Sequence, residues 1–412
     1  MGKKSRKNSS ILSQPIVEDI SSLAALSSFS PNANLFAFIS LAVDRHRLRV
    51  YDTLTEKATA EHTLDSARVS ALIWAKIDFS DTRPAEGSPN KKGKRKRLST
   101  GQPTEDAPSS EAEVIILGLT DGTLHLFSPS HGRLLRMLSH SSSTSSILSI
   151  VLTEGPIIRT SGADGSVRLW DVRKNSIIGT WKIDDRMPYT SMAIRPSQDP
   201  SSGQIGMLVA NHTIRLLSTS SEPEPQPKTI ATFTGHASSI LSLQWDTSPS
   251  SSPPTRFFST AESDRFIYVW EIPPSGSESK LILSIPLDAT VRQIALSPTT
   301  STKKQCILAL SASGKITVYP IPAELTPLTP EKTKHKVPTL LPRSTVNLSL
   351  KRSASSSAGP QILDVAFVPE KVGCIKVARV IRGVRPVFHD VVCSVISGLF
   401  DTMPIETTCS NT

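Results

Sequence analysis

The chain has 412 residues, of which 38% are apolar, so it is long enough to bury a large hydrophobic core. Its 46 Lys and Arg exceed its 36 Asp and Glu, and the resulting charge of +10 favours either a polyanionic partner such as nucleic acid or simply a solvated basic surface. The four cysteines are widely spaced, which argues against a zinc site and against a disulfide framework. No apolar stretch follows the basic N-terminus, which argues against a secreted protein, and no run of about eighteen apolar residues occurs, which argues against a membrane span.

The first residues are expected to lie outside the core. Residues 1–14 form a basic tail that contains the sequence KKSRK. The sequence QPIVEDI follows at 14–20, and we expect it to supply an outer strand, because a free sheet edge leaves backbone groups unpaired.

A repeated pattern dominates residues 44–320. Six segments combine a turn sequence with alternation of apolar and polar residues, as in DGSVRLWD, and they span 44–52, 121–128, 164–171, 211–218, 263–271 and 313–320. Asp-Gly and Asn-containing pairs tolerate the positive φ of tight hairpin turns, and alternation is typical of a half-buried strand. After the first interval the segments recur about every 50 residues, which is near the length of one four-stranded propeller blade.

Further strands are predicted around each of these segments. Two apolar stretches come before it, such as SILSLQWD and RFFSTAE, and another comes after it, such as LILSIPL. Three more stretches, ILDVAFVP, CIKVARVI and GVRPVFHDVV, follow residue 360. Because helical periodicity is nearly absent, the sequence predicts an all-β fold, a β-propeller of seven blades over residues 15–392.

Three polar segments fall outside this pattern. Residues 80–112 interrupt the second blade, residues 323–360 form a Pro- and Ser-rich linker before the last blade, and residues 393–412 form a C-terminal tail. The first insert is expected to be disordered. Its basic cluster is a candidate for nuclear targeting or for salt-sensitive contacts with RNA phosphates, the alternative being a solubilising run of charge. The residues of this cluster are Lys91, Lys92, Lys94, Arg95, Lys96 and Arg97.

Two blades contain a pattern that resembles the WD repeat. TFTGHASSILSLQWD is followed by STAESDRFIYVWE, and LSHSSSTSSILSIV is followed by TSGADGSVRLWD. The resemblance to the WD-repeat family implies that hydrogen bonds from a His, through a Ser or Thr and a turn Asp, to a Trp stabilise each such blade. The matching residues are His140, Thr160, Asp164 and Trp170 in one blade, and His236, Thr260, Asp264 and Trp270 in the other. In both sets the Thr lies ten positions before the Trp.

We interpret these tetrads as structural. A carboxylate that accepts a His N–H fixes the imidazole tautomer, and a buried indole N–H needs an acceptor. A Thr beside a His and Asp pair is also a candidate nucleophile, but the Trp and the repetition have no role in such chemistry. No phosphate-binding loop, His-Glu-x-x-His motif, Gly-x-Ser-x-Gly motif or cluster of metal ligands is found in the sequence, so neither catalysis nor a cofactor is expected.

Three classes of function remain open, because a propeller alone does not separate them. The first is a nuclear scaffold that holds protein partners around an RNA. The second is a WD-repeat adaptor that presents clients in a chromatin or ubiquitin-ligase complex. The third is an enzyme with its active site on the propeller.

A second resemblance favours the scaffold. The order of blades and inserts and the segment IKVARVIRGVRPVFHDV resemble the nucleolar WD-repeat family of U3 small nucleolar RNA-associated protein 5 and WD repeat-containing protein 43. The residues that carry this resemblance are Arg379, Gly383, Arg385, Pro386 and Phe388. It implies a non-catalytic subunit of the small-subunit processome, located in the nucleus and nucleolus, that supports processing of pre-ribosomal RNA, small ribosomal subunit biogenesis and transcription by RNA polymerase I.

The same resemblance implies the partners. They are other WD-repeat processome subunits, pre-ribosomal RNA and the U3 small nucleolar ribonucleoprotein, with no membrane and no small-molecule substrate. Members of that family continue past the propeller into a helical domain that mediates subunit assembly, whereas residues 393–412 have no amphipathic stripe of useful length. The resemblance therefore does not assign the assembly contacts of that domain to this sequence.

Overall fold

Seven antiparallel sheets make up the computed structural model of the chain. It describes residues 26–41, 45–64, 67–79, 111–139, 145–153, 155–182, 187–196, 204–219, 227–246, 255–272, 280–297, 306–311, 315–320, 344–346, 361–369, 371, 374–380 and 385–392. Within each sheet the strands follow one another in sequence and pair only with their neighbours along the chain.

The first four sheets have four strands each. The first contains β1 (Ser27–Phe29), β2 (Leu35–Leu41), β3 (His46–Asp52) and β4 (Ala58–Thr63). The second contains β5 (Val69–Asp78), β6 (Glu111–Leu119), β7 (Leu124–Ser128) and β8 (Arg133–Leu138). The third contains β9 (Ile147–Leu152), β10 (Ile157–Gly162), β11 (Ser166–Asp171) and β12 (Ser176–Lys182). The fourth contains β13 (Ser191–Ile194), β14 (Gln204–Ala210), β15 (Thr213–Thr219) and β16 (Lys228–Thr234).

The remaining three sheets complete the series. The fifth contains β17 (Ile240–Trp245), β18 (Arg256–Ala261), β19 (Phe266–Glu271) and β20 (Lys280–Pro286). The sixth contains β21 (Val291–Leu296), β22 (Cys306–Ser311), β23 (Ile316–Pro320) and β24 (Ser344–Val346). The seventh has three strands within the described residues, β25 (Gln361–Phe367), β26 (Cys374–Val380) and β27 (Val387–Val392).

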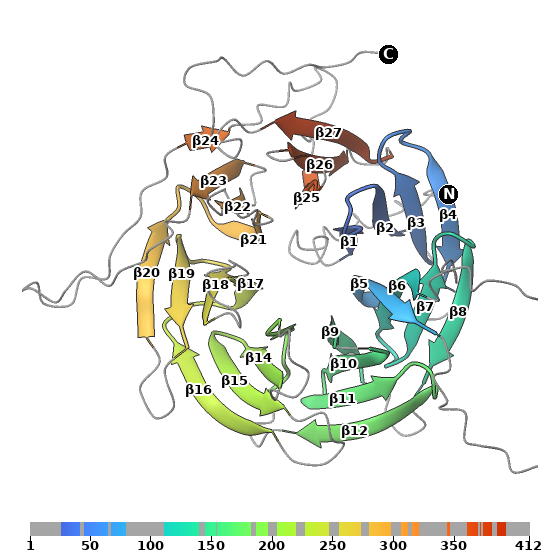
Figure 1. Ribbon diagram of the computed structural model, residues 1–412, viewed down its shortest axis with the longest axis horizontal. Helices are drawn as coiled ribbons and strands as arrows, with labels where there is room; N and C mark the ends of the chain where they lie inside the picture. The colour runs from blue at the N-terminus through green and yellow to red at the C-terminus, as the bar shows by residue number, and fades with distance from the viewer. Residues whose placement is uncertain are drawn as a thin grey trace, which may run out of the picture.

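The sheets are the blades of a ring around a central axis (Figure 1). The first strand of each blade lies nearest the axis and the last strand lies toward the rim, and the seventh blade lies beside the first, where the colour changes from red to blue. The core lies between successive blades, because alternate residues of a strand face opposite neighbours. Leu48 and Val50 of blade 1, for example, pack with Ile115 and Leu117 of blade 2.

Three blades share one turn geometry between their third and fourth strands. Glu56, Gly132 and Asn175 occupy the same place in these turns, with φ of 55°, 61° and 54°. In each blade the strand pairing also shifts register just before the turn, between Val50 and Tyr51 in the first of them. A left-handed residue and a bulge together direct the outer strand back along its partner.

The predicted all-β fold with seven propeller blades is confirmed. The sequence QPIVEDI at 14–20 lies outside the described residues, so its predicted strand stays a prediction. The basic insert connects β5 to β6, and the linker predicted at 323–360 contains β24, which pairs with β23. No helix among the described residues is long and apolar enough to cross a membrane.

Candidate functional site: the hydrogen bonds within blades and the seam of the ring

A chain of hydrogen bonds runs through the interior of blade 5. The indole N–H of Trp270 donates to Oγ of Ser259 at 2.7 Å, and this oxygen lies 2.7 Å from Nε2 of His236. Nδ1 of His236 lies 2.7 Å from a carboxylate oxygen of Asp264. The carboxylate of Asp264 can only accept a hydrogen bond, so the imidazole hydrogen is on Nδ1. Nε2 then accepts the hydroxyl hydrogen of Ser259, while the serine oxygen accepts the indole hydrogen. All four side chains are buried, so the chain fixes the turn after β18 to the strand that carries the Trp.

The hydroxyl that accepts the indole N–H of Trp270 belongs to Ser259 and not to Thr260, so the prediction of Thr260 is wrong. In blade 3, Ile158 pairs with Trp170, and Thr160 is two residues further along the strand. In blade 5, Phe257 pairs with Trp270, and Ser259 is two residues further along. The connection from β18 to β19 is one residue longer than the connection from β10 to β11, which displaces the hydroxyl by one position relative to the Trp. The hydroxyl of Thr260 is buried without a hydrogen-bond partner in the described part of the chain.

The contacts run from a serine to a histidine to an aspartate, as in the catalytic triad of a hydrolase, but here a substrate cannot reach the serine. Ser259 is fully buried, and its oxygen is engaged by the indole N–H of Trp270. Burial lowers the pKa of His236, although the neighbouring Asp264 acts in the opposite direction. Because Ser259 is fully buried and its oxygen accepts the indole N–H, this arrangement stabilises the blade and does not present a nucleophile to a substrate.

Blade 3 contains half of the same arrangement. The indole N–H of Trp170 donates to Oγ1 of Thr160 at 2.8 Å, and both side chains are buried. Asp164 accepts hydrogen bonds from the backbone and hydroxyl of Ser166 and lies 2.7 Å from the guanidinium of Arg168. Partial burial alone would raise the pKa of Asp164, but these donors lower it to about 2. The predicted partner His140 lies outside the described residues.

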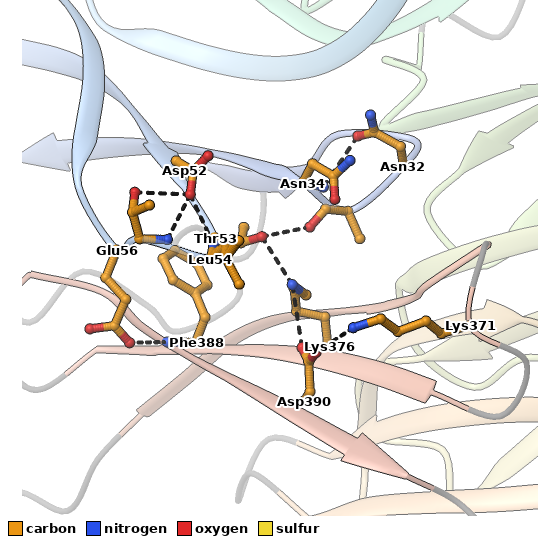
Figure 2. A network of polar contacts seen from close by, with 12 residues as sticks. Asn32, Asn34, Asp52, Thr53, Leu54, Glu56, Lys371, Lys376, Phe388 and Asp390 are labelled. Atoms are coloured by element: carbon orange, nitrogen blue, oxygen red, sulfur yellow. Dashed lines mark hydrogen bonds and ion pairs between the residues drawn. The ribbon is translucent and has the colours of Figure 1, made fainter. Parts of the chain in front are cut away.

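The seam where blade 7 meets blade 1 is held by a network of polar contacts (Figure 2). The ammonium group of Lys376 donates to Oγ1 of Thr53 at 3.0 Å and lies 3.3 Å from a carboxylate oxygen of Asp390. The backbone N–H of Phe388 donates to the carboxylate of Glu56 at 3.3 Å. These contacts join the turn between β3 and β4 to strands β26 and β27, the first and last parts of the described ring.

An aromatic cluster lies at the same seam. The ring of Phe388 is 5.4 Å from the ring of Phe36 and 6.1 Å from the ring of Phe29, in edge-to-face arrangements. Tyr51 and Ala378 belong to the same buried cluster. Edge-to-face pairs add a favourable electrostatic contribution to the burial of aromatic surface. Apolar packing and peripheral hydrogen bonds therefore close the ring together.

A buried carboxylate joins three blades nearer the axis. Asp364 of blade 7 accepts hydrogen bonds from the side chain of Gln293 in blade 6 at 2.6 Å and from the backbone N–H of Phe29 in blade 1 at 3.0 Å. Arg292 of blade 6 donates to the backbone carbonyls of Ile362 and Leu363 beside it. Burial raises the pKa of Asp364 to about 6, against the opposing influence of these donors and of Arg292.

Comparison with known families identifies the repeats. The family described as "WD domain, G-beta repeat" matches residues 132–171 and 227–271, which include Trp170 and all four residues of the blade 5 chain. The chain is a seven-bladed β-propeller that contains WD40 repeats. No curated protein matches the WD40 propeller significantly in sequence. Among solved structures it is similar to the computationally designed Ika8 protein, with 16% identity, a TM-score of 0.47, and coverage of 86% of this chain and 82% of that chain.

The candidate residues of the C-terminal segment fall on two strands of the WD40 propeller and the connection between them. Arg379 lies on β26, Arg385 is exposed just before β27, Pro386 is buried and Phe388 is part of the aromatic cluster at the seam. Gly383 and the basic cluster at 91–97 lie outside the described residues. The described part of the WD40 propeller has no group of three His, Cys, Asp or Glu side chains placed to hold a metal ion.

Sequence reasoning missed the residues that tie the seam of the WD40 propeller. Asp364 stands in the apolar strand sequence QILDVAF and Lys376 in CIKVARV. Charged side chains are rarely buried unless they are paired, so a charged residue inside an otherwise apolar strand indicates a paired, buried charge.

Proposed function

We propose that this WD40 propeller is a non-catalytic scaffold subunit of the small-subunit processome, which supports pre-ribosomal RNA processing, small ribosomal subunit biogenesis and transcription by RNA polymerase I. The observation that carries the scaffold role is the propeller with its WD40 repeats, a fold that typically serves protein interaction. Its best-formed repeat uses Ser259, His236 and Asp264 for internal hydrogen bonds.

Two features of the sequence support the placement in the processome. The segment Arg379 to Phe388 resembles the corresponding segment of a nucleolar WD-repeat family. The net charge of +10 and the basic cluster at 91–97 suit a protein that works close to RNA, because Lys and Arg neutralise phosphates and release counterions. This kind of contact positions an RNA without reading its sequence.

The role of the chain's own residues is to keep a set of loops in fixed relative positions. Blades 3 and 5 are pinned by the Trp170 and Trp270 hydrogen bonds, and the seam is tied by Asp364, Lys376 and Phe388. A closed ring presents the connections between its strands at fixed distances, so several subunits can be held at once without a large ordering cost on binding.

The test is to tag the full chain in its own cells, locate it, and identify the proteins that co-purify with it under native conditions. Nucleolar location together with other WD-repeat processome subunits and the U3 small nucleolar ribonucleoprotein is the expected result. A diffuse cytoplasmic location, or co-purification with chromatin or ubiquitin-ligase subunits instead, would contradict the proposal and favour the adaptor role.

A further inference from the structure

Three of the nine histidines of the chain lie where blade 1 meets blade 2, its neighbour in the ring (Figure 1). His46 is the first residue of β3 and His62 is on β4, both in blade 1, and His125 is on β7 of blade 2. The proposed scaffold role uses none of them. Histidine is the side chain whose charge changes closest to neutral pH, so the charge of this contact between blades depends on pH.

The alternation of the strands turns His62 and His125 toward each other. Ala60 of β4 and Phe127 of β7 pack in the buried cluster between blades 1 and 2, and each lies two positions from one of the histidines. The two imidazole rings are 5.9 Å apart between centroids, and the ring of His62 stacks on the ring of Phe127 at 5.5 Å. Two imidazolium ions at this separation repel each other, whereas two neutral rings pack without repulsion.

His46 joins the two blades through a hydrogen bond that requires its neutral form. Its Nδ1 accepts the backbone N–H of Val69, the first residue of β5, at 3.2 Å. An imidazolium ion carries a hydrogen on both nitrogen atoms and accepts no hydrogen bond. Val69 is buried, so protonation of His46 sets two N–H groups against each other and takes this acceptor away from a buried backbone donor.

Burial favours the neutral form of His125. It lowers the pKa of this histidine, the neighbouring His62 lowers it further, and Asp121 acts in the opposite direction. Nδ1 of His125 is buried without a hydrogen-bond partner in the described part of the chain. A proton added there has no acceptor among those residues, which adds to the cost of the charged form.

The other charged side chains near this contact do not balance three imidazolium charges. Three of them, on β3 and β4, face away from blade 2, because they alternate with residues that pack against it. They pair with one another and are Arg47, Arg49 and Glu61. Arg45 precedes His46, and Arg68 precedes its hydrogen-bond partner, so both add positive charge at that end. The residue paired with His125 on β8 is the apolar Met137.

We infer that His46, His62 and His125 make the contact between blades 1 and 2 a pH-sensitive joint, which is tight at neutral pH and weakens when the histidines take up protons in mildly acidic solution. The unfolded chain binds these protons at the ordinary pKa of histidine, about 6.5, so the folded chain loses stability as the pH falls below that value. Loosening of the joint changes the spacing of the loops that the two blades present. The inference depends on the fold and not on the processome role.

The test is urea denaturation of the full chain at about pH 7.5 and about pH 5.5, on either side of the ordinary histidine pKa. The variants are His46→Asn, His62→Gln and His125→Gln, singly and combined. Asn and Gln do not titrate, and Asn keeps an acceptor near the position of Nδ1. On acidification the unfolding equilibrium constant should rise about fivefold more in the wild type than in a variant, for each histidine whose pKa is one unit lower in the folded chain. The single variants decide the matter if the combined variant does not fold.

Hydrogen exchange, corrected for the intrinsic effect of pH, locates the change. In the wild type, peptides from β4, β5 and β7 should exchange faster at the lower pH relative to those from β19, and in the combined variant they should not. His131→Gln is the matched control, because His131 is exposed and contacts Ser128 and Ser130 within its own turn. An equal pH dependence in the wild type and the variants, faster exchange spread evenly over all blades, or an effect of His131→Gln as large as that of His125→Gln would each overturn the inference.

Discussion

Replacement of Ser259 by Ala tests the hydrogen-bond chain of blade 5 most sharply. The side chain is fully buried, and its oxygen serves both Nε1 of Trp270 and Nε2 of His236. Ser259→Ala leaves both nitrogen atoms buried without a partner. Each unsatisfied buried group costs about 1–3 kcal/mol, so we expect the variant to lose about 2–6 kcal/mol of unfolding free energy.

The neighbouring Thr260→Val is the control for this substitution. The hydroxyl of Thr260 is buried without a partner among the described residues, so its exchange for a methyl group should be neutral or stabilising. Urea denaturation of both variants, followed by tryptophan fluorescence, measures the difference through the midpoint at an unchanged slope. A Thr260→Val variant that loses as much stability as Ser259→Ala would show that the hydroxyl of Thr260, rather than that of Ser259, connects the Trp to the His.

Three further predictions concern the seam and the basic insert. Phe388→Ala should lower the unfolding free energy by about 3 kcal/mol, because it removes a ring from the buried aromatic cluster. Arg385 is exposed, so Arg385→Ala should leave the unfolding free energy unchanged. Equal losses of stability for the two variants in urea denaturation would contradict the prediction. Because the pKa of Asp364 is raised to about 6, its favourable contribution is present below about pH 4 and is lost as the pH rises through 6. The stability of Asp364→Asn relative to the wild type should therefore improve by about 3 kcal/mol between pH 4 and pH 7 in urea titrations, and a constant difference would refute it. Deletion of residues 91–97 should impair nuclear import seen by fluorescence microscopy, and unaffected import would assign targeting elsewhere.

The strands were predictable from the sequence because the blades are built from local hairpins. Turn sequences such as Asp-Gly and the alternation that follows them place β7, β11 and β19 without knowledge of any distant contact. The shared period then predicts the strands on either side. For the same reason the number of blades follows from counting repeats, even where the closing Trp is replaced by Tyr51, Phe127 or Leu217.

The site was less predictable because it depends on register and on contacts between the ends of the chain. A fixed spacing from Trp270 selected Thr260, since the extra residue in the turn after β18 is visible only once the strands are paired. The bonds from Lys376 to Thr53 and from Phe29 to Asp364 join residues more than 300 positions apart. The periodicity of the sequence does not predict contacts between residues so far apart.

The seam gives the ring a place where its two ends are joined by side chains. Blades 1 to 6 are each linked to the next blade by the continuous chain, whereas the contact of blade 7 with blade 1 in the described residues depends on Asp364, Lys376 and the cluster around Phe388. Loss of these groups should therefore loosen the relative positions of loops on the whole ring. This connects the stability of the seam to the capacity of the scaffold to hold partners.

Crosslinking of RNA to the tagged full chain in living cells, followed by sequencing of the bound RNA, tests the proposed role in the processome most directly. Reads concentrated in the 5′ leader of pre-ribosomal RNA and in the U3 small nucleolar RNA are the predicted result, and their recovery should fall as salt is raised before crosslinking in extracts. Recovery of no RNA above an untagged control, or of RNA unrelated to ribosome assembly, would contradict the role.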